Sequence, residues 1–236
     1  GKHYGLYDIP HDDKKTYAMI QRAETIGVFQ IESRAQMTML PRLKPKCFYD
    51  LVVEVAIIRP GPIQGKVIHP YLRRRDGIEA VTYPDPCLEP ILKRTLGIAI
   101  FQEQAMRIAV AVGDFTGGEA NELRRNIGAW NVRDFDQTLG PWMEKLKTGM
   151  KQKGFDDYFI EQILGQMKGF SDYGFPESHA ISFAFIAYAS CYLKCHYPAA
   201  FFTSVLNSQP MGFYSPHNLL QAAKQEGVEV LPPCVN

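Results

Sequence analysis

The chain has 236 residues, 46% of them hydrophobic, and its 26 basic and 25 acidic side chains give a formal net charge of +1. This apolar content is ample for one large core or two small ones. The nearly neutral charge excludes a chain that attracts nucleic acid with its whole surface, so any basic patch must be local.

The five cysteines are an odd number without the spacing of a disulfide framework. This pattern excludes a secreted disulfide scaffold and favours reduced thiols in a cytoplasmic protein. Cys191, Cys195 and His196 are residue types that bind metals, but their spacing in an apolar helix favours core packing, and we expect no metal there. No segment has the pattern of a signal peptide or a membrane anchor, so we expect neither. Because it does not start with methionine, we expect an excised piece of a longer protein.

The N-terminal quarter predicts helices joined by short connections. Apolar residues recur there at helical spacing, and an aspartate or a serine precedes the periodic runs, as is typical of a helix N-cap. Glu54 alone interrupts the apolar run that follows Asp50, so that helix is predicted to be buried. The predicted elements are a helix over 13–24 capped by Asp12, an extended run over 25–31, a helix from Ser33 that ends before Pro41, and a buried helix over 50–58.

The next part of the chain predicts two helices separated by a rigid loop. The first, over 64–75, ends in Arg73-Arg74-Arg75, a triplet typical of a solvated face, with phosphate contact as the alternative. Tyr83-Pro84-Asp85-Pro86 follows as the loop. The second helix, over 101–112, is amphipathic, with Gln102 outside its apolar stripe.

Thr116 and Glu119 have the spacing of a capping box, which predicts a firm helix start. Arg124 and Arg125 lie in the last turn of that helix, where a cation also interacts favourably with the helix dipole. Residues 121–153 carry seven basic and four acidic side chains, a local charge of +3. This is a modest basic patch in a nearly neutral chain.

The longest predicted helix runs from Pro176 to about Tyr197 and follows a helix that Asp156 is expected to cap. No charged residue occurs from Ala180 to Leu193. A helix that is apolar nearly all round is buried in a protein core or in a membrane, and this run is shorter than a membrane span and interrupted by serines. We interpret it as the central buried helix.

The beginning of this helix has the features of an anion site. The backbone N–H groups of a first helical turn have no partner within the helix. Ser178 and His179 add side-chain donors, and Tyr173-Gly174-Phe175 is a turn with two aromatic faces for a nucleobase. The alternative is a well-capped core helix in which Ser178 and His179 satisfy each other.

After Pro198 the sequence predicts two further helices, the second capped by Ser215, and a short strand over 228–230. In all, the sequence predicts about ten helices and little sheet. The predicted fold class is mainly α.

Several short motifs follow one another in a fixed order along the chain. Each is weakly specific alone, but the series resembles the fingers domain of C-family bacterial DNA polymerases, the polymerase III α subunit type, over nearly the whole chain. The motifs are Val28-Phe29-Gln30-Ile31-Glu32-Ser33, Arg59-Pro60-Gly61-Pro62, Tyr83-Pro84-Asp85, Phe101-Gln102-Glu103-Gln104, Leu123-Arg124-Arg125, Tyr173-Gly174-Phe175 with Ser178-His179, and Leu193-Lys194-x-His196-Tyr197-Pro198.

Two segments resemble the accessory, error-prone DnaE-type polymerases more than the replicative ones. They are Gly128-Ala129-Trp130 and the run 208–214. Replicative members tend to carry lysines where this chain has Ala129 and Trp130, so the resemblance implies a looser grip on the nucleotide and a role in error-prone repair or translesion synthesis.

The resemblance implies that residues 1–200 are the fingers domain and that 201–236 lead toward a helix-hairpin-helix region. Family members catalyse with three palm aspartates that hold two Mg²⁺, upstream of this chain, so the piece alone is expected to be inactive and to hold no metal. Asp134 and Asp136 are interpreted as part of a solvated loop or a helix start. The implied partners are a primer–template DNA, a deoxynucleoside triphosphate (dNTP), the palm, thumb and PHP domains, and the sliding clamp through regions outside the chain, with no membrane.

The resemblance also implies roles for particular residues. Arg124 and Arg125 are expected to grip the β- and γ-phosphates, because guanidinium is always charged and binds phosphate in bidentate fashion. Tyr173, Gly174 and Phe175 are expected against the nascent base pair, with Ser178 and His179 nearby. Two other classes stay open, a non-enzymatic helical module that binds nucleic acid and a structural or protein-interaction domain. Secondary candidates are Arg59, Gln102, Lys145 and Lys147.

Overall fold

The computed structural model describes residues 5–58, 64–128, 139–171, 175–212 and 214–232, and only the backbone of 64–69, 127–128 and 168–171. The described residues form helices and no strand, and an isolated parallel bridge joins Phe101 to Phe175. The predicted mainly α fold is therefore confirmed. Among these residues, no helix combines the length and the apolar character that crossing a membrane requires.

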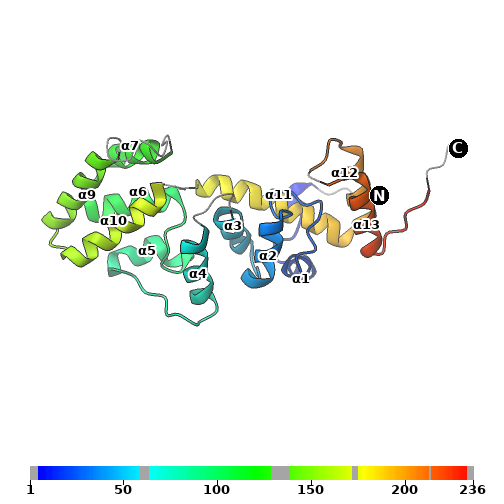
Figure 1. The fold of residues 1–236 in the computed structure, drawn as a ribbon, viewed down its shortest axis with the longest axis horizontal. Coiled ribbons are helices and arrows are strands. Elements are labelled where there is room, and N and C mark those ends of the chain that lie inside the picture. The colour runs from blue at the N-terminus through cyan, green and yellow to red at the C-terminus, as the bar shows by residue number, and fades with distance from the viewer. Residues whose placement is uncertain (1–4, 59–63, 129–138, 172–174, 213, 233–236) are drawn as a thin grey trace. The chain divides into compact units, whose positions relative to one another are not determined.

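The chain forms two compact units, whose helices are labelled in Figure 1. Unit 1 comprises residues 1–58 and 180–236, and unit 2 comprises residues 59–179. Helix α11 (Glu177–His196) starts in unit 2 and continues in unit 1. The boundary predicted from the sequence, between a fingers domain over 1–200 and the segment 201–236, is a different division of the chain and stays a prediction.

Unit 1 combines helices from both ends of the chain. Its second helix opens on a capping box, since the Gln36 N–H donates to Ser33 Oγ (3.3 Å) and the Ser33 N–H to Gln36 Oε1 (3.2 Å). The expected Ser215 cap is also present, with its hydroxyl accepting from the Asn218 N–H at 3.3 Å. Besides most of α11, the helices are α1 (Lys14–Gln21), α2 (Arg34–Leu43), α3 (Phe48–Ile57), α12 (Pro198–Asn207) and α13 (Pro216–Gln225), preceded by a short 3-10 turn, η1 (Leu6–Asp8).

Two predicted boundaries in unit 1 are wrong. The cap of α1 is Asp13 and not Asp12, because Asp13 Oδ1 accepts the Thr16 N–H at 2.8 Å. Helix α2 continues through Pro41 to Leu43. Leu40 and Leu43 are both buried there, and their packing outweighs the preference of proline for ending a helix.

Both predicted extended segments of unit 1 are also wrong. Residues 25–31 form turns, in which the Thr25 hydroxyl donates to the Ile31 carbonyl and Val28 is fully buried. Residues 228–230 follow a turn at Gly227 (φ 79°) without pairing to another strand. An alternating pattern becomes a strand only where a partner edge exists, and the described fold offers none here.

Helix α11 is a core helix on one side only. Ala184, Ala187 and Cys191 are buried, whereas Ile186 is 47% and Leu193 37% exposed. The expectation that the helix is buried all round is therefore wrong. Its apolar composition supplies both a packed side and an apolar surface.

Unit 2 is a helical bundle built from one continuous stretch of the chain. Leu146, Ile108 and Ile163 belong to its apolar core, to which consecutive helices contribute. Within the unit, α6 packs on α7 and α9, and α9 packs on α10 (Figure 1). The helices are α4 (Gln64–Arg75), α5 (Glu89–Leu92), α6 (Gln102–Gly113), α7 (Gly117–Gly128), α9 (Gly140–Gln152) and α10 (Asp157–Ser171), with the 3-10 turns η2 (Pro86–Leu88) and η3 (Lys93–Thr95).

Two glycines let α6 and α9 approach closely. A Cβ placed on Gly149 would lie 2.1 Å from the Gly113 carbonyl oxygen, and one on Gly113 would lie 2.3 Å from a Leu146 methyl. A backbone atom cannot move aside as a side chain can, so this crossing requires glycine at position 149. Helix α9 was not predicted from the sequence, where residues 121–153 were described only as a modest basic patch.

Candidate functional site

Helix α7, which carries the two predicted phosphate-binding arginines, begins at the predicted capping box. The Thr116 N–H donates to Glu119 Oε2 (2.9 Å), and the Glu119 N–H donates to Thr116 Oγ1 (3.3 Å). The Lys145 ammonium of α9 also binds the Glu119 carboxylate. Hydrogen bonds from Lys145 and then Thr116 lower the pKa of Glu119 to about 2. The start of α7 is therefore fixed to α9.

Both arginines pair with residues of their own helix. Arg124 donates from Nε and Nη2 to Asn121 Oδ1 at 3.2 Å each, and it is partly buried. Arg125 Nη1 lies 2.9 Å from Glu122 Oε1, and its side chain is 64% exposed. An exposed ion pair of this kind contributes at most about 1 kcal/mol, so a stronger anion can displace Glu122.

The beginning of α11 is attached to the beginning of α6. The Gln102 N–H donates to the Phe175 carbonyl (3.0 Å), which forms the isolated bridge. The Glu177 N–H donates to Glu103 Oε2 at 2.9 Å, and Arg94 Nη1 lies 3.6 Å from Glu177 Oε1. The Glu177 N–H was predicted from the sequence to be available to an anion. In the structure it is bound instead by the Glu103 carboxylate of α6.

The predicted donors at this helix start lie next to Phe175. The rings of Phe175 and His179 meet edge to face, with centroids 5.1 Å apart, and Ser178 and His179 are both exposed. Glu103 and Glu177 already bring negative charge to the first turn of α11. A phosphate is therefore expected to bind the arginines of α7 rather than the backbone N–H groups of this turn. Of the other predicted site residues, Tyr173, Gly174 and Arg59 lie outside the described residues, as do Asp134 and Asp136.

Gln104 is a positioning residue that the sequence analysis missed. Its Oε1 accepts from the Ile100 N–H (2.8 Å) and the Phe101 N–H (3.0 Å), and its Nε2 donates to Thr95 Oγ1 (2.7 Å). These bonds hold the backbone that receives Phe175. Gln104 belongs to the Phe101-Gln102-Glu103-Gln104 motif, but the motif alone does not predict which of its two glutamine side chains bonds to the backbone. Gln102, expected outside the apolar stripe, is 8% exposed and therefore buried.

The two secondary lysine candidates differ. Lys145 is bound to Glu119 and lies 5.1 Å from the centroid of the Phe115 ring, so it helps to fix α7 on α9. Lys147 is half-buried and pairs with no carboxylate in the described part of the chain. Lys147 is thus the better placed of the two for a phosphate.

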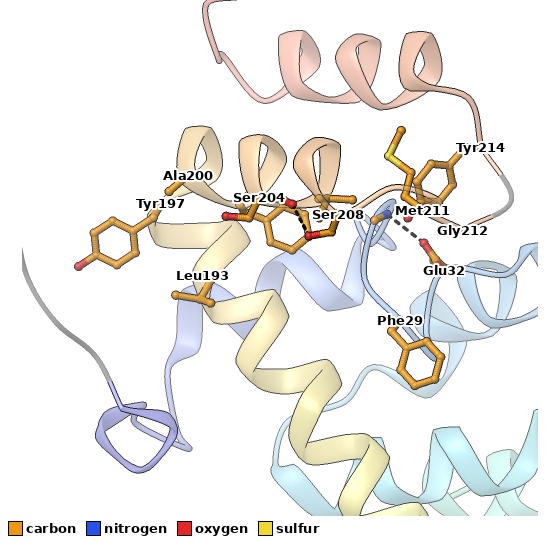
Figure 2. Close-up of a pocket in the computed structure, with 13 residues that line it drawn as sticks. Phe29, Glu32, Leu193, Tyr197, Ala200, Ser204, Ser208, Met211, Gly212 and Tyr214 are labelled. Atoms are coloured by element: carbon orange, nitrogen blue, oxygen red, sulfur yellow. Dashed lines mark hydrogen bonds between the residues drawn. The ribbon is translucent and has the colours of Figure 1, made fainter.

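A separate pocket of about 760 Å³ lies in unit 1 (Figure 2). Glu32 Oε2 accepts a hydrogen bond from the Gly27 N–H at 3.1 Å. Figure 2 shows Glu32 and Tyr214 among the residues that line the pocket. Burial and a hydrogen bond to Glu32 raise the pKa of Tyr214. The pocket is mainly apolar, with Phe29 and Leu193 in its lining, and it includes part of the run 208–214.

Asp13, Cys195 and His196 bring three potential metal-ligand atoms within 4.8 Å of one another. Asp13 Oδ1 already accepts hydrogen bonds from the Thr16 N–H and hydroxyl, and it lies 2.9 Å from His196 Nε2. These contacts account for the cluster as the cap of α1. Cys191, in contrast, is fully buried in the core.

Comparison with known proteins identifies the family. An "Error-prone DNA polymerase" of Pseudomonas fluorescens is 60% identical over 231 residues, which cover 98% of this chain and 22% of the relative. "Error-prone DNA polymerase 1" of Agrobacterium fabrum is 60% identical over 237 residues, and the Methylococcus capsulatus "Error-prone DNA polymerase" is 55% identical over 236. The chain spans about a fifth of the length of these relatives.

Residues 1–154 match the family described as the bacterial DNA polymerase III alpha subunit finger domain. This match covers more than half of the chain and contains α7 with its two arginines. The chain therefore belongs to the finger-domain family of the bacterial DNA polymerase III alpha subunit.

Proposed function

We propose that the chain is the fingers portion of a DNA-directed DNA polymerase that performs error-prone synthesis, and that it binds the incoming dNTP. Arg124 and Arg125 bind the β- and γ-phosphates, and Phe175 with Tyr173 and Gly174 lies against the nascent base pair. The family membership supports the activity, and the names of the relatives support the error-prone class.

One structural observation supports the arrangement of this site. Helix α6 packs on α7, which carries the arginines, and its first residues hold the backbone of Phe175 and Glu177. Both halves of the proposed site are therefore built on the same helix of unit 2. Fixed cations lower the barrier of nucleotidyl transfer because negative charge gathers on the departing pyrophosphate.

The metal chemistry is assigned to other parts of the whole protein. Two Mg²⁺ ions held by palm aspartates outside this chain would activate the primer 3′-hydroxyl. The residues described here bind and orient the triphosphate. The whole protein acts on primer–template DNA, with the palm, thumb and PHP domains and the sliding clamp as partners in a cytoplasmic setting.

Steady-state kinetics of the full-length polymerase tests the arginine pair. Arg124→Ala and Arg125→Ala should each lower kcat/KM for dNTP by roughly 10² or more, because each removes transition-state charge stabilisation. Arg125→Lys, which keeps the charge without the bidentate geometry, should lose less.

The control is Arg22→Ala in unit 1. Arg22 is 59% exposed and pairs with Glu24 at 2.7 Å, much as Arg125 pairs with Glu122. This variant should retain normal kinetics. If both α7 variants lose less than threefold in kcat/KM and keep the wild-type stability, the two arginines do not bind the dNTP and serve only in contacts within their own helix.

A further inference from the structure

Unit 2 contains a polar cavity whose described lining includes none of the residues proposed to bind the dNTP. Its volume is about 510 Å³, and small-molecule pockets measure roughly 300–1,000 Å³. Its walls come from α4, the loop after α4, and α10. The residues that matter here are Arg74, Tyr83, Pro84, Tyr158, Gln162 and Gln166.

Three of these side chains form a row on α10. Tyr158, Gln162 and Gln166 follow one another at intervals of four residues, which places them on one face of the helix. Gln162 Nε2 donates to the Tyr158 hydroxyl oxygen at 2.8 Å. This bond leaves the hydroxyl proton of Tyr158 and the amide oxygen of Gln162 for a ligand.

Gln166 has an unsatisfied amide. Its Oε1 is buried, and no donor in the described residues reaches it. A buried acceptor without a donor is rare in proteins. Because a half-turn of the amide exchanges its oxygen and nitrogen, Gln166 can offer either a donor or an acceptor to the cavity.

Arg74 brings a positive charge to the opposite wall. Its Nε pairs with Glu79 Oε1 (3.1 Å) and its Nη1 donates to the Leu96 carbonyl (2.8 Å), so the guanidinium is held in place. Its side chain is only 14% exposed. These bonds use two of its five N–H groups, and the others remain as donors for an anion.

Two tyrosines add aromatic surfaces. Tyr83 belongs to the Tyr83-Pro84-Asp85 motif, to which the dNTP site gives no role, and it lines the cavity with Pro84. Tyr158 is 74% exposed, so one face of its ring is open to solvent. Aromatic rings beside a cation are the combination that binds single-stranded nucleic acid, because every base has a face that stacks.

We propose that this cavity binds an unpaired nucleotide of single-stranded DNA. The base stacks on Tyr83 or Tyr158, and its edge bonds to the amides of Gln162 and Gln166. Glutamine matches the donor and acceptor edge of adenine, so adenine is the preferred base. The phosphate lies toward Arg74. This site goes beyond the proposed dNTP function, because it needs neither Arg124 nor Arg125.

Binding and crosslinking of the full-length polymerase test the site. Tyr158→Leu and Gln162→Leu should each lower the affinity for a short single-stranded deoxyadenosine oligomer about tenfold in fluorescence anisotropy. Tyr7→Leu and Gln221→Leu, which alter exposed side chains of unit 1, should not. Irradiation with deoxyadenosine oligomers that contain 8-azidoadenine should attach DNA to peptides with Tyr83 or Tyr158.

Normal affinity in both cavity variants, with no crosslink at either tyrosine, would overturn the site. An equal loss for fully paired duplex DNA would also overturn it, because the cavity would not select an unpaired nucleotide. Failure of the dNTP proposal is distinguishable. Arg125→Ala should leave the crosslink intact, and Tyr158→Leu should leave kcat/KM for dNTP normal on a template with a one-nucleotide overhang.

Discussion

The two units of the chain differ in what they bury. Among the described residues, the buried ionisable side chains Asp50, Glu54 and Lys194 all belong to unit 1. The described interior of unit 2 is mainly apolar. Its buried polar side chains, among them Gln102 and Gln104, carry no charge. Unit 1 joins two segments that are far apart in the sequence, whereas unit 2 is one continuous stretch.

Lys194 shows why unit 1 needs buried charge. Its Nζ donates to the carbonyls of Glu24 (2.9 Å) and Ile26 (2.8 Å) and pairs with Glu226 at 2.8 Å. Carbonyl groups of a buried turn require donors, and an apolar helix face cannot supply them. We infer that buried polar bonds add to the apolar core of unit 1, while the close crossing of α6 and α9 adds to the apolar core of unit 2.

The largest expected effect comes from Glu54, whose carboxylate oxygens are buried and have no hydrogen-bond partner among the described residues. Burial raises the pKa of Glu54 from 4.5 to about 8. Between these two pH values Glu54 is therefore neutral in folded unit 1 and ionised in the unfolded chain. The stability of unit 1 should therefore fall as pH rises from about 4.5 to about 8, by at most about 5 kcal/mol.

Hydrogen exchange as a function of pH measures this loss separately for each unit. Glu54→Gln keeps the shape and removes the titration, so its unit 1 should depend much less on pH. Unit 2, which buries no carboxylate among its described residues, serves as the internal control. The same pH dependence in the wild type and in Glu54→Gln would show that Glu54 is not neutral in the fold.

A smaller effect is expected for Lys194→Met. The change keeps the volume but leaves two carbonyls and Glu226 without their donor, which should cost about 3 kcal/mol. Chemical denaturation should show the loss, and hydrogen exchange should locate it in unit 1. Lys224→Met, at an exposed position of α13, is the matched control and should stay within about 0.5 kcal/mol of the wild type. Equal stability of the two variants would contradict the role of Lys194.

The smallest expected effect lies in unit 2. Gly149→Ala adds a methyl group where the Gly113 backbone is 2.1 Å away, so α6 and α9 must separate, at a cost of about 2 kcal/mol. Thermal unfolding and hydrogen exchange of α9 should both register the change. Gly165→Ala, on α10 with open space around it, should be neutral or stabilising. A neutral Gly149→Ala would mean that the glycine crossing does not hold unit 2 together.

Several helix starts of this chain were predicted correctly from residues three positions apart in the sequence. Ser33 with Gln36 and Thr116 with Glu119 form the expected caps, and Asp156 accepts the Phe159 N–H at 2.7 Å. A cap depends on residues three positions apart, so its signal lies within a few letters of sequence. Asp12 and Asp13 are adjacent, and spacing alone did not say which of them caps α1.

The candidate site was predictable only in part. Sequence motifs led to the finger-domain family, which the match over 1–154 confirms. They also led to Arg124 and Arg125, whose role in binding phosphate stays a prediction. They did not show that Glu103 binds the first amide of α11, or that Gln104 holds the bridge to Phe175. These partners come from α6, which lies far from α11 in the sequence.

By itself, the sequence determined the helical class, most helix positions and the family. Only the tertiary structure decided that Lys145 binds Glu119, that Glu54 is buried without a partner in the described part of the chain, and that Gln162 and Gln166 line one cavity. The physical reason is that helix formation and capping depend on neighbours along the chain. Burial, charge pairing and cavities depend instead on which helix faces meet, and that is settled only when the helices pack.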